Sequence, residues 1–175
     1  MKILIVGAEA TNKIQLAKMI QELNDDLIIS PMFTTELSVE GHVTDDFKYY
    51  LAEEEVQLAY KNNAFMWVLS SSMESHGVTL SDMYSSDIFV MSYKEFNNIS
   101  NPVLSNIMED GIIIWLDSKY HNDADKIESS YAYERLSENK YLYFRDDDFS
   151  LVAQTALSFY LGDINKREEL LNEYN

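Results

Sequence analysis

The sequence predicts a single α/β domain of three layers, in which helices cover both faces of a mainly parallel central sheet. Residues 2–6, 87–91 and 111–117 are apolar runs, rich in β-branched side chains, without polar alternation. Such runs are typical of strands buried on both faces of a parallel sheet. Strands that alternate with helices predict βαβ units, whose ligands bind at the carboxyl ends of the strands.

The other expected elements lie between and after these runs. They are, in chain order, a helix over 14–23, a short strand over 27–29, helices over about 52–62 and 123–138, a last strand over 140–144, a helix over about 148–161 capped by Asp148, and a charged helix over about 163–174. Residues of about 32–85 are mixed and rich in Tyr and Ser, so we expect an insertion after the second strand. The domain of 1–175 then has a core of about 1–31 and 86–161.

The composition restricts the kind of partner. Of 175 residues, 30 are acidic and 13 basic, which gives a formal net charge of −17. This charge repels a phosphate backbone and disfavours nucleic-acid binding; it serves solubility or attracts a basic partner protein. Cysteine is absent, which excludes disulfides and thiolate metal sites. Because no apolar run suits a signal peptide or a membrane span, we expect a cytoplasmic protein.

An octet that starts at Gly7 follows a strand and opens a helix, in register with the phosphate-loop pattern G-x-x-x-x-G-K-S/T. Gly7 and Lys13 match, which predicts nucleotide phosphates beside Lys13. Asn12 replaces the second glycine, and Asn tolerates a positive φ better than most residues. Ile14 replaces the hydroxyl that holds Mg²⁺, and Glu9 adds negative charge to a loop suited to anions. The alternative is an ordinary strand–turn–helix with a chance Gly and Lys.

The segments beyond this loop resemble guanylate kinase. The stretch FTTE at 33–36 is similar to that family's S-x-T-T-R segment, and DDFKYYLAEEEV at 45–56 to its D-Y-x-F-V-S-x-E-E-F. Later, KNNAFMW at 61–67 resembles N-x-E-F-I-E-W, HGVT at 76–79 resembles Y-G-T/S, and YLYFRDD at 141–147 resembles V-I-V-N-D-D. The resemblance covers about residues 1–160 and implies a P-loop kinase-like fold with an acceptor-binding insertion.

Departures from the family pattern imply a weakened catalyst. Guanylate kinases bind the acceptor phosphate with two Arg residues in T-T-R-x-x-R, where this chain has Glu36 and Val39. A carboxylate repels the phosphate that an Arg would bind. The strand aspartate associated with Mg²⁺ is replaced by Val90 or Ser92.

The resemblance also implies roles for particular residues. Lys13 would bind the donor phosphates, together with Gly7 and Asn12. Arg135, in the short segment that replaces the family's Arg-rich lid, would be the remaining transfer arginine. Six polar side chains would line an acceptor-like pocket: Thr34, Thr35, Tyr49, Tyr50, His76 and Thr79. Ordinary packing is the alternative for the aromatic ones. The histidines lack metal-ligand spacing, so we expect no metal site.

Three hypotheses about function stay open. The first is a degenerate guanylate kinase-like protein that acts by binding a protein partner or, weakly, a nucleotide. The second is an active (deoxy)nucleoside monophosphate kinase, which would use ATP and Mg²⁺. The third is an acidic mimic of nucleic acid that inhibits a basic protein. The abundance of Asn, Tyr and Asp is associated with phage and viral genomes.

Overall fold

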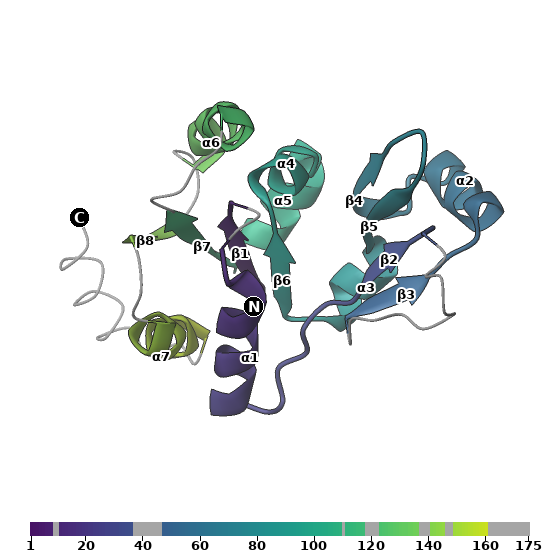
Figure 1. Cartoon of the computed structure of the whole chain (residues 1–175). Helices are drawn as coiled ribbons and strands as arrows, with labels where there is room; N and C mark the ends of the chain where they lie inside the picture. Colours follow the sequence, from purple (N-terminus) through teal and green to yellow (C-terminus); the bar gives the residue numbers. More distant parts are fainter. Residues whose placement is uncertain are drawn as a thin grey trace.

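The computed structural model describes residues 1–8, 11–36, 47–109, 111–117, 123–136, 141–145 and 149–160. Its central sheet has the strand order β6-β1-β7-β8, and all neighbouring strands are parallel (Figure 1). These strands span, in sheet order, Ile88–Met91, Ile3–Gly7, Ile112–Asp117 and Tyr141–Arg145. The predicted parallel sheet is confirmed, with β1 in its interior.

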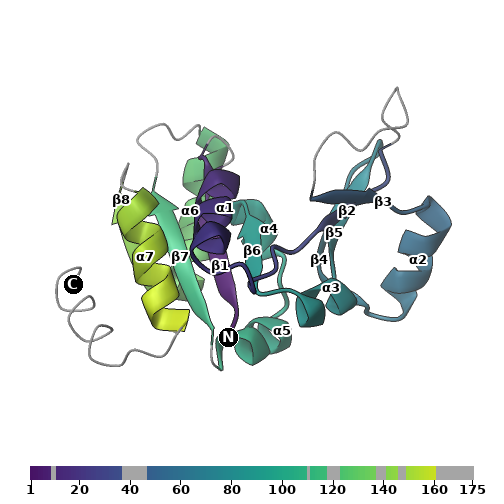
Figure 2. The same ribbon diagram turned by 90° about the horizontal axis from the view of Figure 1, so that it is seen from below.

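Helices cover both faces of this sheet, which gives the three predicted layers (Figures 1 and 2). On one face lie α1 (Lys13–Leu23) and α7 (Phe149–Tyr160), which pack against each other. On the other lie α4 (Tyr93–Asn97), α5 (Asn101–Met108) and α6 (Asp123–Leu136). The sheet and these five helices are called the core below.

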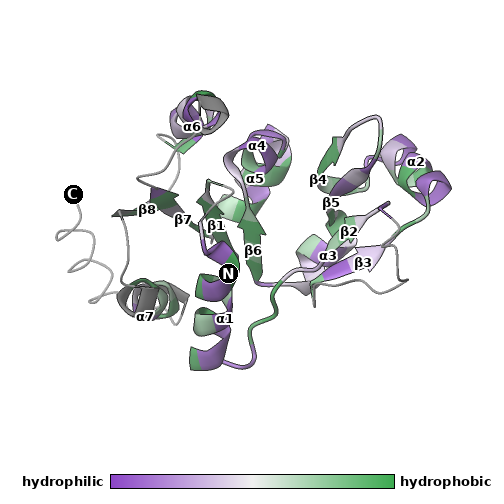
Figure 3. Ribbon diagram, in the orientation of Figure 1, coloured by the Kyte–Doolittle hydropathy of each residue, from purple (hydrophilic) through white to green (hydrophobic). Residues whose placement is uncertain are grey.

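The two faces of the sheet belong to two separate apolar clusters. Successive residues of a strand point to opposite faces. Ile3 and Ile5 of β1 therefore pack in the cluster that contains residues of α1 and α7. Leu4 and Val6 pack in the cluster that contains residues of α4, α5 and α6. Figure 3 shows the resulting concentration of apolar residues in the central strands.

The predicted strand over 27–29 does not form as a strand of its own. Ile29 makes one isolated parallel bridge with Ile88 of β6. The backbone bonds around it are Ser30 N–H to Ile88 O at 2.8 Å and Ile88 N–H to Ile28 O at 3.0 Å. Residues 27–29 thus lie beside β6 at the edge of the sheet but pair with it at one residue only, because the chain turns away at Pro31 into the insertion.

The insertion forms a second sheet rather than an irregular segment. Its strand order is β3-β2-β5-β4, with β2 parallel to β3 and antiparallel to β5. The strands are β2 (Met32–Thr34), β3 (Lys48–Tyr50), β4 (Phe65–Ser70) and β5 (Ser75–Thr79), and the helices are α2 (Glu53–Lys61) and α3 (Leu80–Ser85). These elements are called the inserted lobe. Figure 2 shows the lobe beside the core.

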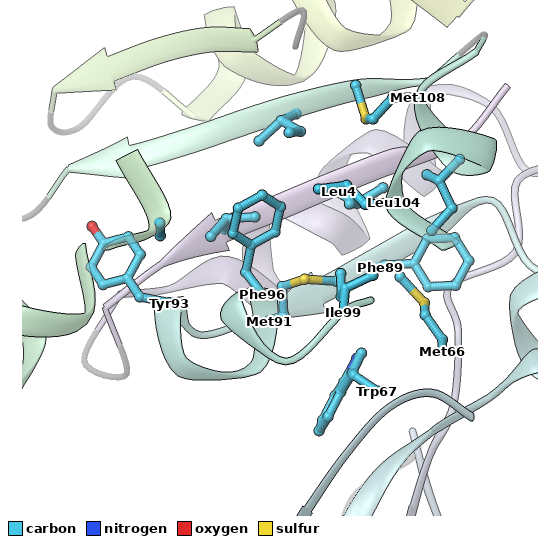
Figure 4. Close-up of a cluster of buried hydrophobic side chains, with 14 of the residues drawn as sticks. Leu4, Met66, Trp67, Phe89, Met91, Tyr93, Phe96, Ile99, Leu104 and Met108 are labelled. Carbon is cyan, nitrogen blue, oxygen red and sulfur yellow. The ribbon is translucent and has the colours of Figure 1, made fainter. Parts of the chain in front are cut away.

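Large apolar side chains join the inserted lobe to the core. Met66, Trp67 and Val78 belong to the same buried cluster as Phe89 and Phe96 of the core (Figure 4). Gly77 permits the close packing of β5 in the lobe, because a Cβ there would lie 2.4 Å from the Trp67 carbonyl oxygen. The lobe is therefore fixed at one end by apolar contact.

The remaining sequence expectations have mixed outcomes. The helix over 52–62 is confirmed as α2, that over 123–138 as α6, and the strand over 140–144 as β8. The helix over 148–161 corresponds to α7, although its expected cap, Asp148, lies outside the described residues, as does the helix over 163–174. No helix in the described part of the chain combines the length and apolarity needed to cross a membrane.

Candidate functional site

The loop between β1 and α1 lies at the carboxyl edge of the central sheet. A Cβ added to Gly7 would lie 2.9 Å from Thr11 Oγ1 and 3.0 Å from the Leu116 carbonyl oxygen. The backbone at Gly7 thus passes too close to β7 for a side chain to fit without a shift. Thr11 Oγ1 donates a hydrogen bond to the Ala8 carbonyl at 2.6 Å, which closes the turn.

Lys13 is the first residue of α1, and its ammonium group lies within this loop. Nζ donates to the Ala8 carbonyl oxygen and, at 3.1 Å, to Thr11 Oγ1. The residue is only 7% exposed. Burial penalises a charge, and the positive end of a helix dipole disfavours a cation. A negative group beside this loop would offset both effects.

The neighbouring strand end carries a carboxylate. Because β6 is parallel to β1 with Val6 opposite Met91, Ser92 follows β6 next to the loop that begins at Gly7. Ser92 is the N-cap of α4, and its N–H donates to Glu95 Oε2 at 2.5 Å, while Glu95 N–H donates to Ser92 Oγ at 3.3 Å. Burial raises the pKa of the Glu95 carboxyl, but the interaction with His76 and the bonds to Ser92 outweigh it, so the pKa lies below its usual value.

A second carboxylate ends β7. Asp117 accepts a hydrogen bond from the Tyr143 hydroxyl at 2.5 Å. One position earlier, the Leu116 carbonyl accepts the hydroxyl of Tyr93 at 3.0 Å, and the Tyr93 ring stacks on Trp115 with centroids 4.6 Å apart. Tyr93 is buried and links α4 to β7, so its role is to fix the start of α4.

Three of the six predicted acceptor residues form one row on the inserted lobe. Thr34 of β2 pairs with Tyr50 of β3 and with His76 of β5. Residues paired directly across a sheet place their side chains on the same face. That face is turned toward the core, because His76 lies against Trp67 and contacts Glu95 of α4. Thr34, Tyr50 and His76 are called the polar row below.

The other three predicted acceptor residues are used within the lobe. Tyr49 and Thr79 lie on the opposite face, and their hydroxyls donate to Asp82 Oδ2 at 2.7 and 2.6 Å. Thr35 Oγ1 accepts the Ser75 N–H at 2.8 Å. Burial and the bond to Asp82 raise the pKa of Tyr49 above its ordinary value. The predicted pocket is therefore split by the pleat of the sheet.

The chain is similar in structure to a guanylate kinase from Anaplasma phagocytophilum. The similarity has a TM-score of 0.52 at 13% sequence identity and covers 97% of this chain and 86% of that one. The chain has a P-loop kinase-like fold. No family model matches the sequence, and no curated protein matches it either.

This P-loop kinase-like fold departs from its expected phosphate loop at two positions. Asn12 has φ −77° and makes no side-chain capping bond, so it does not adopt the left-handed conformation that a second glycine would allow. Ile14 is 41% exposed and presents only hydrocarbon where the pattern places a hydroxyl. Within the described ranges, no group of three His, Cys, Asp or Glu side chains is arranged to hold a metal ion. Ile14 therefore offers no oxygen to a magnesium ion at the position where the pattern expects one.

The structure places the Arg135 guanidinium against the end of α4. Because α6 runs back from the end of β7 to the start of β8, its penultimate residue lies toward the amino edge of the sheet, away from Lys13. The guanidinium donates to the carbonyl oxygens of Phe96 and Ile99, both at 2.6 Å, and lies over the Phe96 ring. Arg135 therefore caps the end of α4 instead of facing the phosphate loop.

Two residues of this region were missed by sequence reasoning. Glu95 is visible in sequence as the last residue of an S-x-x-E capping box, which predicts its bond to Ser92 but not its contact with His76. Asp82 likewise ends the T-x-x-D box that begins at Thr79. Their longer-range contacts depend on how the inserted lobe packs, which no local pattern reveals.

Proposed function

We propose that this protein binds the phosphates of a nucleotide at the loop between β1 and α1 and transfers phosphate slowly or not at all. The observation that carries the proposal is the buried ammonium of Lys13 at the start of α1. Backbone N–H groups at a helix start attract anions, and a lysine there neutralises phosphate charge. The guanylate kinase-like fold supports a nucleotide as the source of that phosphate.

Slow transfer follows from the positions of the charged side chains Glu36 and Arg135. Phosphoryl transfer needs positive charge at the donor phosphates, at the acceptor phosphate and on the group in flight. Glu36 is exposed where the family resemblance implies an acceptor arginine, and Arg135 is bonded at the other edge of the sheet. One missing contact of this kind costs about 3–4 kcal/mol of barrier.

An active (deoxy)nucleoside monophosphate kinase is the second candidate. The observation in its favour is that the similarity to a guanylate kinase extends over the inserted lobe as well as the core. The polar row faces the core from that lobe. An acceptor nucleotide with a different base or sugar would then be bound by residues other than the two arginines.

Isothermal titration calorimetry with ATP, with and without Mg²⁺, tests the proposal. The variant Lys13→Ala should weaken ATP binding about tenfold or more, equivalent to about 1.4 kcal/mol. Lys18→Ala is the matched control, because Lys18 lies on the same helix, is exposed and packs over Phe47. Equal affinities of wild type and Lys13→Ala would contradict a phosphate site at this loop. Absence of binding to every nucleotide would favour a basic protein as the ligand of this acidic chain.

A further inference from the structure

The pair His76–Glu95 connects the inserted lobe to the core. His76 belongs to β5 of the lobe, and Glu95 to the first turn of α4, directly after β6. Nε2 of His76 lies 3.6 Å from Oε1 of Glu95. The pair lies next to Trp67, which joins the lobe to the core by apolar packing. The rings of Trp67 and His76 meet edge-on, with 5.9 Å between their centroids. The pair thus adds a polar connection to the apolar one.

The two partners are fixed to different degrees. Glu95 is held by the Ser92 N–H at 2.5 Å through its other oxygen, Oε2, and its side chain is only 14% exposed. His76 has no such anchor: its contacts to Glu95 and to Glu74, at 3.6 and 3.9 Å, are both longer than hydrogen bonds. Its side chain is 29% exposed. Movement of His76 away from Glu95 therefore breaks no capping bond of α4.

The charged groups around His76 are carboxylates. Among the described residues, Glu74 faces it from the turn before β5 and Glu95 from α4. The neighbouring strands place Thr34 of β2 and Leu69 of β4 opposite it, and neither side chain titrates in water near neutral pH. Attraction across the pair thus requires a protonated imidazole and an ionised Glu95.

We propose that His76 and Glu95 form a charge-dependent tie between the inserted lobe and the core, and that an anion at the lobe competes with Glu95 for His76. The tie operates in a limited pH window. Glu95, with a lowered pKa, contributes stability above about pH 4.5 and loses it as pH falls through its folded-state pKa. Histidine is the side chain whose charge ordinarily changes between about pH 5 and 8. The coupling is therefore strongest near pH 5.5 and falls by pH 8.5.

A double-mutant cycle on the ligand-free protein tests the tie. Wild type, His76→Asn, Glu95→Gln and the double variant are melted at pH 5.5 and 8.5. The Glu95→Gln variant keeps a side-chain oxygen that can accept the Ser92 N–H, so the cap of α4 is retained. At pH 5.5 the Tm change of the double variant should differ by roughly 1–3 °C from the sum of the two single changes. At pH 8.5 this difference should be smaller. Glu74→Gln is the control, with weaker coupling because Glu74 is farther away and more exposed.

Competition by an anion is tested with inorganic phosphate as the probe. At pH 5.5 Glu95→Gln should bind phosphate about two- to fivefold tighter than wild type, whereas His76→Asn should bind it more weakly. A residue with only a structural role would not improve binding when it is replaced. Additive melting at both pH values, or no tightening in Glu95→Gln, overturns the inference. The phosphate titrations use the Lys13→Ala background, in which the loop between β1 and α1 lacks its ammonium group, so failure of the proposed nucleotide site would leave these outcomes unchanged.

Discussion

Tyr49 of β3 donates its phenolic hydrogen to Asp82 at the start of α3, with 2.7 Å between the two oxygens. The same carboxylate oxygen accepts the hydroxyl of Thr79, which caps α3. One carboxylate therefore connects an edge strand, the last strand of the β4–β5 pair and a short helix. Two residues that the guanylate kinase resemblance assigns to substrate binding thus stabilise the inserted lobe.

Replacing Tyr49 with Phe should lower the free energy of unfolding by about 1–2 kcal/mol at pH 7, because a hydrogen bond to a charged acceptor is lost. The raised pKa of Tyr49 gives this effect a pH dependence. Its stabilisation is complete below about pH 10, the ordinary pKa of tyrosine, and is lost as pH rises through the higher folded-state pKa. Urea denaturation at pH 7 and at pH 11 measures both effects. Tyr50→Phe, which removes an exposed hydroxyl from the next residue, is the control and should change little.

Replacing Arg135 with Gln should lower the free energy of unfolding by roughly 2–4 kcal/mol, because two charge-assisted bonds to Phe96 and Ile99 are lost. ATP affinity, measured by calorimetry on the folded variant, should remain that of wild type. Lys94→Gln, an exposed change on α4, controls for the loss of one positive charge. A variant of normal stability with weakened nucleotide binding would return Arg135 to the functional site.

Replacing Gly7 with Ala should both destabilise the protein and weaken ATP binding, because the new methyl group displaces Thr11 or β7 from the loop. Gly111→Ala is a matched control, since its Cβ would lie 2.4 Å from the Ile107 carbonyl oxygen, beyond the amino end of β7. Both variants should melt at lower temperature, but only Gly7→Ala should change the ATP dissociation constant. Equal effects on ATP binding would mean that destabilisation alone explains the loss.

Replacing Ile14 with Thr should introduce a magnesium dependence that wild type lacks. Ile14 is exposed at the start of α1, so the smaller polar side chain should fit without loss of stability. In wild type, ATP should bind equally well with Mg²⁺ and with a chelator, since no hydroxyl is present at this position. A clear gain from Mg²⁺ in wild type would show that a carboxylate such as Asp117 serves the metal.

The central sheet could be predicted from sequence, whereas the strands of the inserted lobe and their side-chain contacts could not. The runs around Ile5, Phe89 and Ile114 are buried on both faces, so their apolar character is uninterrupted and easily recognised. The strands Met32–Thr34 and Lys48–Tyr50 have only three residues each, too few to show a period. Which hydroxyl meets Asp82 and which side chain meets Glu95 depends on strand register, and register is set by packing of the whole lobe.

The position of Arg135 in the fold could not be predicted from sequence either. Sequence alone places an arginine between two strands, where a kinase lid would lie. Its distance from Lys13 depends on the length of α6, which spans 14 residues, or about 21 Å. The chain therefore returns to the opposite edge of the sheet before Arg135 is reached. Sequence therefore identifies the segment that carries Arg135 but not the edge of the sheet at which the side chain lies.

A coupled assay of ADP release, with ATP and each common ribo- and deoxyribonucleoside monophosphate, tests the central claim most directly. Binding without rapid transfer predicts turnover far below the range of about 1–100 s⁻¹ usual for kinases, for every acceptor, in protein that binds ATP by calorimetry. Lys13→Ala, which lacks the ammonium group at the loop, sets the background rate of the assay. Turnover within the usual range with any single acceptor would contradict the claim and identify the protein as an active nucleotide kinase.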